Sequence, residues 1–168
     1  IEGRHIRRYS NKGEIIWSVN YINDDNNRNY NSEFLIVDEY LYHTIKSHNN
    51  AKVVKRSMQT GDSIKSRDFY SDVPIVYHDS YIYIGNSGIK QYDLNLNEVR
   101  HFSINTPIKM KANSRGIVCL FNDGGIYVFN PINGELFRNS RIGNNDIATS
   151  YDNYTFGVKN EGYSYVTK

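Results

Sequence analysis

Short apolar segments alternate with polar turns along most of the chain. Between residues 74 and 103 the turns contain His, Asp, Ser, Asn and Gly, which favour tight reversals of the backbone. Short strands that follow one another every eight to twelve residues or so, with such turns between them, indicate an antiparallel sandwich, barrel or propeller. The pattern predicts four strands in this part of the chain, at 74–77, 81–84, 89–92 and 99–103.

The same pattern recurs with a fixed period. Gly88, Gly125 and Gly162 are 37 residues apart, and each follows turn residues and precedes a strand-like segment. We expect glycine at this point to supply the positive φ that a tight hairpin needs. The unit that follows the first one has its predicted strands at 108–111, 117–121, 126–129 and 136–140.

A second turn repeats within each unit. Asn97 and Gly134 come nine residues after Gly88 and Gly125, and both belong to residue types that tolerate the left-handed region. Upstream, Gly61 and Gly13 close similar segments at 53–62 and 6–14. The step from Gly13 to Gly61 is 48 residues rather than 37, because a polar, Asn-rich stretch at 23–31 is predicted to be a loop inserted between units.

A four-stranded sheet repeated at a constant interval favours a propeller, in which neighbouring sheets bury each other's faces. The predicted fold is therefore all-β, with about four propeller-type antiparallel units in a single β-repeat domain, 1–168. Because the chain opens and closes on a third strand, we expect either a piece of a longer propeller or an incomplete, open arrangement. In the second case free edges would favour self-association. The expected units are about 1–22, 33–69, 73–104, 107–142 and 146–168.

Composition narrows the possible partners. The chain has 15 Tyr, 7 Phe and only 3 Pro, which suits strands with large buried side chains. Its 20 basic and 18 acidic residues give a net charge of +2 and no electrostatic basis for binding nucleic acid. The basic run Arg4–Arg8 is predicted to be a solvated strand face or edge. No apolar run reaches 18 residues, so we expect no membrane insertion within this segment.

Candidate chemistry is sparse. Cys119 lies alone in an apolar segment, which predicts a buried, inert thiol and excludes a disulfide within the chain. The acidic residues near Asp24 lack the spacing of a calcium-binding loop. We therefore predict no catalytic residue, no metal and no cofactor, and expect that the protein is not an enzyme. The histidines, which lack the spacing of a metal site, are His5, His43, His48, His78 and His101.

Paired aromatic residues occupy alternate strand positions and so share one face of a strand. Core packing between sheets is the prediction for these residues, rather than an exposed aromatic stripe, and the same holds for Trp17. The pairs are Tyr81 and Tyr83, Tyr127 and Phe129, and Tyr163 and Tyr165.

The segment 13–17 begins with the turn glycine Gly13 and ends with Trp17. It resembles the quinoprotein-type (PQQ-like) propeller repeat. In that family a turn closes on Gly, and a Trp a few residues later docks between blades. Residues 92–98 and 129–135 are similar through the turn and then depart from the family pattern, with Phe102 and Asn139 at or near the Trp position. The residues expected to serve structure and packing are Trp17, Gly61, Gly88, Gly125, Gly134 and Gly162.

The resemblance also implies a range of functions. Dehydrogenases of the family hold a quinone and calcium with the help of a disulfide between adjacent cysteines, for which this chain has too few cysteines. Non-enzymatic members include bacterial envelope scaffolds and the dimerising lumenal sensor domains of endoplasmic-reticulum stress kinases, which favours a location outside the cytoplasm. The predicted function is a protein-binding or scaffolding module whose partner is another protein or a second copy. The alternatives are a stress sensor that signals by dimerisation and a fragment of a quinoprotein-type dehydrogenase.

Overall fold

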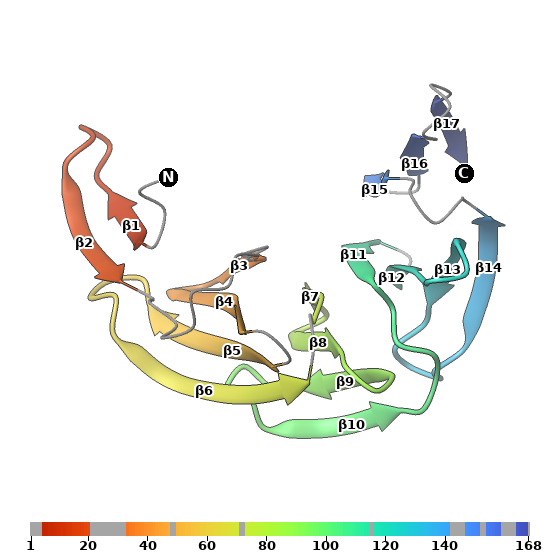
Figure 1. Ribbon diagram of the computed structural model, residues 1–168, viewed down its shortest axis with the longest axis horizontal. Coiled ribbons are helices and arrows are strands. Elements are labelled where there is room, and N and C mark those ends of the chain that lie inside the picture. Colours follow the sequence, from red (N-terminus) through yellow and green to blue (C-terminus); the bar gives the residue numbers. More distant parts are fainter. Residues whose placement is uncertain are drawn as a thin grey trace. The chain divides into compact units, whose positions relative to one another are not determined.

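The computed structural model describes residues 5–20, 33–47, 50–70, 73–114, 116–141, 147–151, 154–158 and 164–167 (Figure 1). For residues 46–47 and from 138 onward it describes the backbone alone. Every regular element in these ranges is a β-strand, and the strands form antiparallel sheets. The chain divides into two compact units, Ile1–Asp72 and Val73–Lys168. The predicted Asn-rich loop and Gly162 lie outside the described residues.

In its described residues, unit 1 contains a two-stranded and a four-stranded sheet. In both, each strand pairs with the next one along the chain. The first sheet consists of β1 (His5–Tyr9) and β2 (Ile15–Asn20), and the second of β3 (Phe34–Val37), β4 (Tyr40–Ser47), β5 (Asn50–Ser57) and β6 (Ser63–Tyr70).

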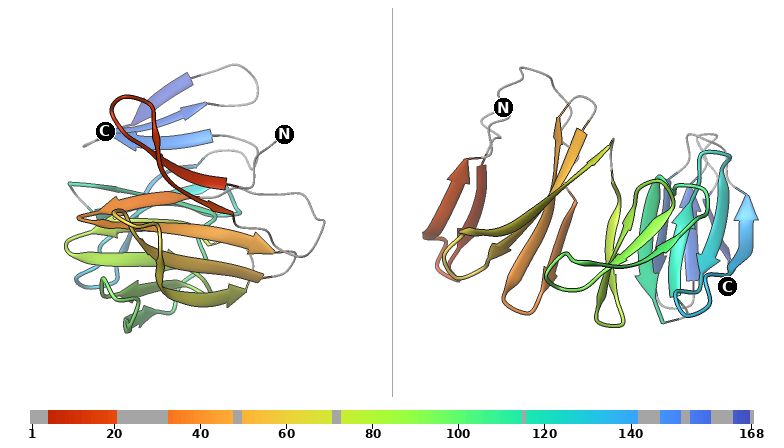
Figure 2. Two further views of the ribbon diagram at one scale, coloured as in Figure 1. Left: turned by 90° about the vertical axis from the view of Figure 1, so that its left-hand side faces the viewer. Right: turned by 90° about the horizontal axis from the view of Figure 1, so that it is seen from below.

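The part of unit 2 that the structure describes contains two four-stranded sheets and a three-stranded sheet with the same sequential pairing. The first strands of successive sheets meet, since β7 lies beside β11 and β11 beside β15 (Figure 2). The predicted all-β fold of four-stranded units is confirmed. The strands are β7 (Ile75–His78), β8 (Tyr81–Gly85), β9 (Ile89–Tyr92) and β10 (Glu98–Phe102); β11 (Lys109–Asn113), β12 (Gly116–Leu120), β13 (Gly125–Phe129) and β14 (Leu136–Arg141); and β15 (Ile147–Tyr151), β16 (Tyr154–Val158) and β17 (Ser164–Thr167).

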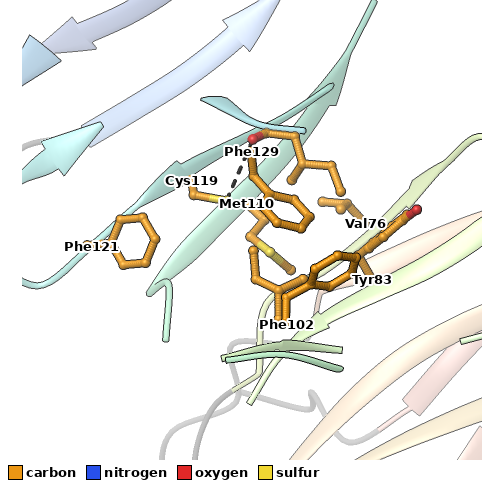
Figure 3. Packing of buried hydrophobic residues seen from close by; sticks show 9 residues of the cluster. Val76, Tyr83, Phe102, Met110, Cys119, Phe121 and Phe129 are labelled. Atoms are coloured by element: carbon orange, nitrogen blue, oxygen red, sulfur yellow. Dashed lines mark hydrogen bonds between the residues drawn. The ribbon is translucent and has the colours of Figure 1, made fainter. Parts of the chain in front are cut away.

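The main described core of unit 2 lies between the β7–β10 sheet and the β11–β14 sheet (Figure 3). Phe102 and Phe129 meet edge to face in it, with ring centroids 4.8 Å apart. Tyr83 is buried in this core and Tyr81 packs against it, and Phe129 and Tyr127 behave in the same way. Core packing is thus confirmed for these two aromatic pairs, while the side chains of the third pair are outside the described residues.

Both faces of the β11–β14 sheet are apolar. Cys119 faces the core just described, whereas Val118 and Leu120 belong to a cluster on the opposite face. All five residues of β12 are buried, as expected for a strand covered on two sides. Cys119 is fully buried, as predicted, and this burial raises the pKa of its thiol.

The structure corrects the prediction that Gly125 supplies a positive φ. The left-handed residue of that turn is Gly124, with φ 74°, whose N–H donates to the carbonyl oxygen of Phe121 at 3.0 Å. Gly125 already belongs to β13, and a Cβ there would lie 2.5 Å from Cε2 of Tyr127. Crowding therefore requires the glycine. At Gly88 both reasons apply, since φ is 113° and a Cβ would collide with the carbonyl oxygen of Phe102.

The expectation that Asn97 occupies the left-handed region is also wrong by one residue. In this turn the N–H of Asp93 donates to the carbonyl oxygen of Asn97, four residues on, whereas in the next sheet Asn130 donates to Glu135, five residues on. The shorter turn moves the positive φ to Leu96, where φ is 56°. Leu96 is 1 % exposed, so burial of its side chain offsets the backbone strain.

Candidate functional site

Trp17 docks the β1–β2 sheet of unit 1 on the turn between β5 and β6. We call a contact of this kind, in which an aromatic ring of one sheet lies on a turn of the next, a dock. Gly61 in that turn has φ 80°, and a Cβ on it would lie 2.8 Å from Cδ2 of Trp17, so only glycine allows the indole to approach this closely. The indole Nε1 also donates a hydrogen bond to the carbonyl oxygen of Met58 at 2.8 Å. Trp17 thus both covers the turn and satisfies one of its backbone acceptors.

Arg8 on β1 supports the same turn. It pairs with Trp17 across the two strands, and its Nη1 also donates to the carbonyl oxygen of Met58. The basic run was expected to be a solvated face or edge, and the exposed Arg7 agrees with that expectation. Arg8 departs from it, because its guanidinium is half-buried and bonded to the turn.

Beneath the turn lies a polar pair, the buried His43 and the half-buried Arg56, that the sequence did not predict. Arg56 Nε donates to Nε2 of His43 at 3.0 Å, and Arg56 Nη1 donates to the carbonyl oxygen of Gly61 at the same distance. His43 is 0 % exposed. Burial, and then the charge of Arg56, lower the pKa of His43 to about 4, so the imidazole is neutral at pH 7. The sequence contains a signal for the burial of His43, since this residue lies two positions after Leu41 on β4 and therefore on the same apolar face.

An exposed apolar surface adjoins this pair. Phe34 and Ile36 alternate on β3 and share one face, and we call these two residues the β3 apolar face. Their side chains are 54 % and 63 % exposed, although both are large and hydrophobic. The ring of Phe34 stacks on that of His43, with centroids 6.3 Å apart. The β3 apolar face therefore lies on the same side of the sheet as the His43–Arg56 pair.

A second dock, in unit 2, uses two side chains in place of one. Phe102 on β10 packs against Gly134, whose φ is 82°, so that a Cβ there would lie 3.0 Å from the phenyl ring. Arg100 pairs with Gln91 in the position that Trp17 has opposite Arg8. Its guanidinium lies 4.4 Å from the centroid of the Phe102 ring and donates to the carbonyl oxygen of Ile132 at 3.0 Å. Phe102 thus covers the turn while Arg100 makes the hydrogen bond.

The structure brings together some of the predicted packing residues and leaves others apart. Trp17 meets Gly61, and Phe102 meets Gly134, whereas Gly88 and Gly125 belong to the other hairpin of their sheets. Asn139 is described only by its backbone. Among the described residues there is no cluster of three or more His, Cys, Asp or Glu that could hold a metal. The same ranges include no helix long and apolar enough to cross a membrane.

No family model and no curated protein sequence matches the chain. Solved structures do. BamB from Moraxella catarrhalis is 14% identical with a TM-score of 0.66, over 100% of this chain and 59% of that chain. The computationally designed Ika4 protein is 17% identical with a TM-score of 0.59, over 82% of this chain and 92% of that one. BBS1N, solved in complex with ARL6DN, is 9% identical with a TM-score of 0.50, over 98% of this chain and 72% of that chain.

These likenesses identify the class of fold. The chain is a propeller-type β-repeat, with sheets similar to those of BamB, a PQQ-like propeller, and of designed propellers. At such low identities the similarity shows the fold alone. The link to the lumenal sensor domains of stress kinases finds no support in these comparisons. The chain spans 59% of the BamB chain that it matches.

Proposed function

We propose that this chain is a non-enzymatic protein-binding or scaffolding module that binds its partner through the β3 apolar face. The observation that carries the proposal is the exposure of Phe34 and Ile36, two large apolar side chains on one face of one strand. Val37 on the same strand is 5 % exposed, so β3 is anchored on one side and open on the other.

The strand also offers a backbone edge. Within the described residues β3 pairs only with β4, which leaves the other edge of Phe34–Val37 able to accept an added strand. Main-chain hydrogen bonds along such an edge provide affinity, and apolar contacts on the adjoining face provide specificity. Covering one apolar side chain fully contributes about 1.5–3 kcal/mol, and half-exposed side chains contribute less, so the edge and the face have to act together.

The fold supports this use. BBS1N has similarly arranged sheets and was solved in complex with another protein, ARL6DN. Binding proteins of this kind use sheet edges and loops and do not need a deep polar pocket.

The experiment begins with a photo-crosslinking residue at position 36 of the full-length protein in its native cells, which captures the partner for identification. The purified partner is then titrated against the wild type and against the double variant Phe34→Ser/Ile36→Ser. We expect at least a tenfold weaker Kd for the double variant, since two apolar contacts are lost. The matched control is Ile132→Ser, at a side chain 80 % exposed in unit 2, which should leave the affinity unchanged.

Other outcomes would contradict the proposal in distinct ways. Equal weakening by Ile132→Ser would move the binding surface to unit 2, and no weakening by the double variant would exclude the β3 apolar face. Crosslinks between two copies of the chain would favour the dimerising alternative. Calcium together with a redox-active chromophore in the purified protein would favour a quinoprotein-type dehydrogenase.

A further inference from the structure

We propose that His43 makes the Trp17 dock sensitive to acid, so that protonation of its imidazole releases the β1–β2 sheet from the β5–β6 turn. The inference rests on the chain of contacts from His43 through Arg56 and Gly61 to Trp17. It is independent of the proposed partner-binding function, because none of these contacts involves Phe34 or Ile36.

The first contact requires a neutral imidazole. Nε2 of His43 accepts the hydrogen bond from Arg56 Nε at 3.0 Å, and a ring nitrogen can accept only while it carries no proton. Protonation turns this acceptor into a second donor and places two cations against each other in a buried site. Arg56 cannot lose its own proton in the accessible pH range, so the hydrogen bond has to break.

The same guanidinium holds the turn. Arg56 Nη1 donates to the carbonyl oxygen of Gly61, and the indole of Trp17 rests on the α-carbon of that residue. When Arg56 moves away from His43 it also leaves Gly61, and the peptide beneath the indole loses its support. Trp17 and Arg8 are both bonded to the carbonyl oxygen of Met58 in this turn, so a shift of the turn disturbs both strands of the docked sheet.

The charge of Arg56, which approaches from β5, opposes protonation of His43. A second cation, Arg8, reaches the turn from β1, and Asp62 in the turn is a carboxylate whose charge acts on Arg56. From β3 the neighbour of the imidazole is the apolar ring of Phe34, and the backbone N–H of Glu33 just before it donates to Oγ1 of Thr44.

The direction of the pH effect follows from the pKa of His43 in the docked form and in the released form of the β1–β2 sheet. In the docked form the pKa of His43 is lowered from 6.5 to about 4, because the imidazole is buried and faces Arg56. In the released form the imidazole is hydrated and takes up a proton near its ordinary pKa of about 6.5. Docking is therefore fully stabilised above pH 6.5 and weakens as the pH falls from 6.5 toward 4. The ratio of docked to released forms falls by up to about tenfold per pH unit, or about 100-fold between pH 7 and pH 4.

The test uses Trp17, the single tryptophan of the chain, as its reporter. The emission of the full chain is recorded from pH 7.5 to pH 4, and we expect a reversible red shift between pH 6.5 and pH 4 as the indole leaves Gly61. His43→Gln should abolish the shift, since the amide oxygen can accept from Arg56 but does not titrate. His78→Gln, a change in unit 2, is the matched control and should keep the shift.

An emission that stays constant down to pH 4 in the wild type would overturn the proposal. A shift in His43→Gln with the wild-type midpoint would overturn it as well, because another group would then be responsible. If His43→Gln does not fold, NMR titration of the His43 ring in the wild type decides the question. Its protonation should coincide with the Trp17 transition, and protonation of His43 with Trp17 undisturbed would also contradict the proposal.

Discussion

The docks in the two units use different side chains to cover a turn glycine and to donate a hydrogen bond to the turn. Each has a glycine with a φ near 80°, Gly61 in unit 1 and Gly134 in unit 2, and each receives an aromatic ring from the sheet before it. In unit 1 the indole of Trp17 covers the glycine and donates the hydrogen bond. In unit 2 Phe102 covers the glycine, and Arg100 donates. What recurs between the two docks is the geometry of the turn, whereas the identity of the docking residue differs.

The surroundings of the two docks differ more. Phe102 lies in an apolar core with Phe129 and Ile117, whereas the turn beneath Trp17 rests on Arg56 and His43. Burial of apolar area is insensitive to pH, but a buried neutral imidazole is not. The comparison therefore predicts that the unit 1 dock responds to acid and that the unit 2 dock does not.

The largest effect is expected from Phe102→Ala, which empties a site that is 6 % exposed. Removing a buried phenyl ring costs about 3–5 kcal/mol, because transfer energy is lost and a cavity remains. Denaturant unfolding followed by far-UV circular dichroism should show this loss. Phe137→Ala, at a ring 54 % exposed, is the control and should cost well under half as much. Equal costs would mean that the unit 2 dock contributes little.

The next effect is the loss of unit 1 stability in acid. The pKa of His43 is lowered to about 4 in the folded protein, so the unfolded chain binds the proton first as the pH falls below 6.5. At about 1.4 kcal/mol per pH unit, the difference approaches about 3 kcal/mol by pH 4. Unfolding free energies at pH 7 and pH 4.5, measured by urea unfolding followed by circular dichroism, should differ more in the wild type than in His43→Gln.

Trp17→Ala should cost about 2–3 kcal/mol, which is less than Phe102→Ala. The indole is only half-buried, so less apolar area is exposed again, although its hydrogen bond to Met58 is also lost. Urea unfolding followed by circular dichroism measures the change. A cost as large as that of Phe102→Ala would show that the two docks contribute equally to the free energy of unfolding in spite of their different burial.

Smaller effects are expected at the glycines. Gly61→Ala places a side chain at a φ of 80° and 2.8 Å from Trp17, whereas Gly134→Ala leaves 3.0 Å to Phe102. The backbone conformation alone costs about 1–2 kcal/mol in both variants. Combining Gly61→Ala with Trp17→Ala separates the steric term, since the double variant should lose less than the sum of the two single changes. Strict additivity would contradict the close packing of the indole on Gly61.

The smallest effect should come from deletion of residues 23–31, the Asn-rich stretch between the sheets of unit 1. Its composition lacks the apolar periodicity of a packed element. We expect the melting temperature to stay within about 8 °C of the wild type, which corresponds to less than about 1 kcal/mol in a small domain. A larger drop, measured by thermal circular dichroism, would mean that this stretch packs against the docked sheet.

The local sequence pattern was sufficient to predict the strands, their order and the class of the fold. Alternation and turn residues act over a few positions, so the third strands predicted at the two ends of the chain appear as β1 and β17. The role of Trp17 as a docking residue could also be anticipated, because residues 13–17 resemble the PQQ-like repeat, in which a Trp after the turn glycine docks between blades. The one-residue errors at Gly125 and Asn97 arose where a closing hydrogen bond, which residue type does not reveal, sets the length of the turn.

The residues that support each dock became apparent only in the folded chain. Trp17 meets Gly61 44 positions later in the chain, and Arg56 reaches His43 across the β4–β5 hairpin. Neither contact follows from composition or spacing, because both depend on strand register and on how one sheet lies over the next. Such contacts are set by packing, and packing is a property of the folded chain.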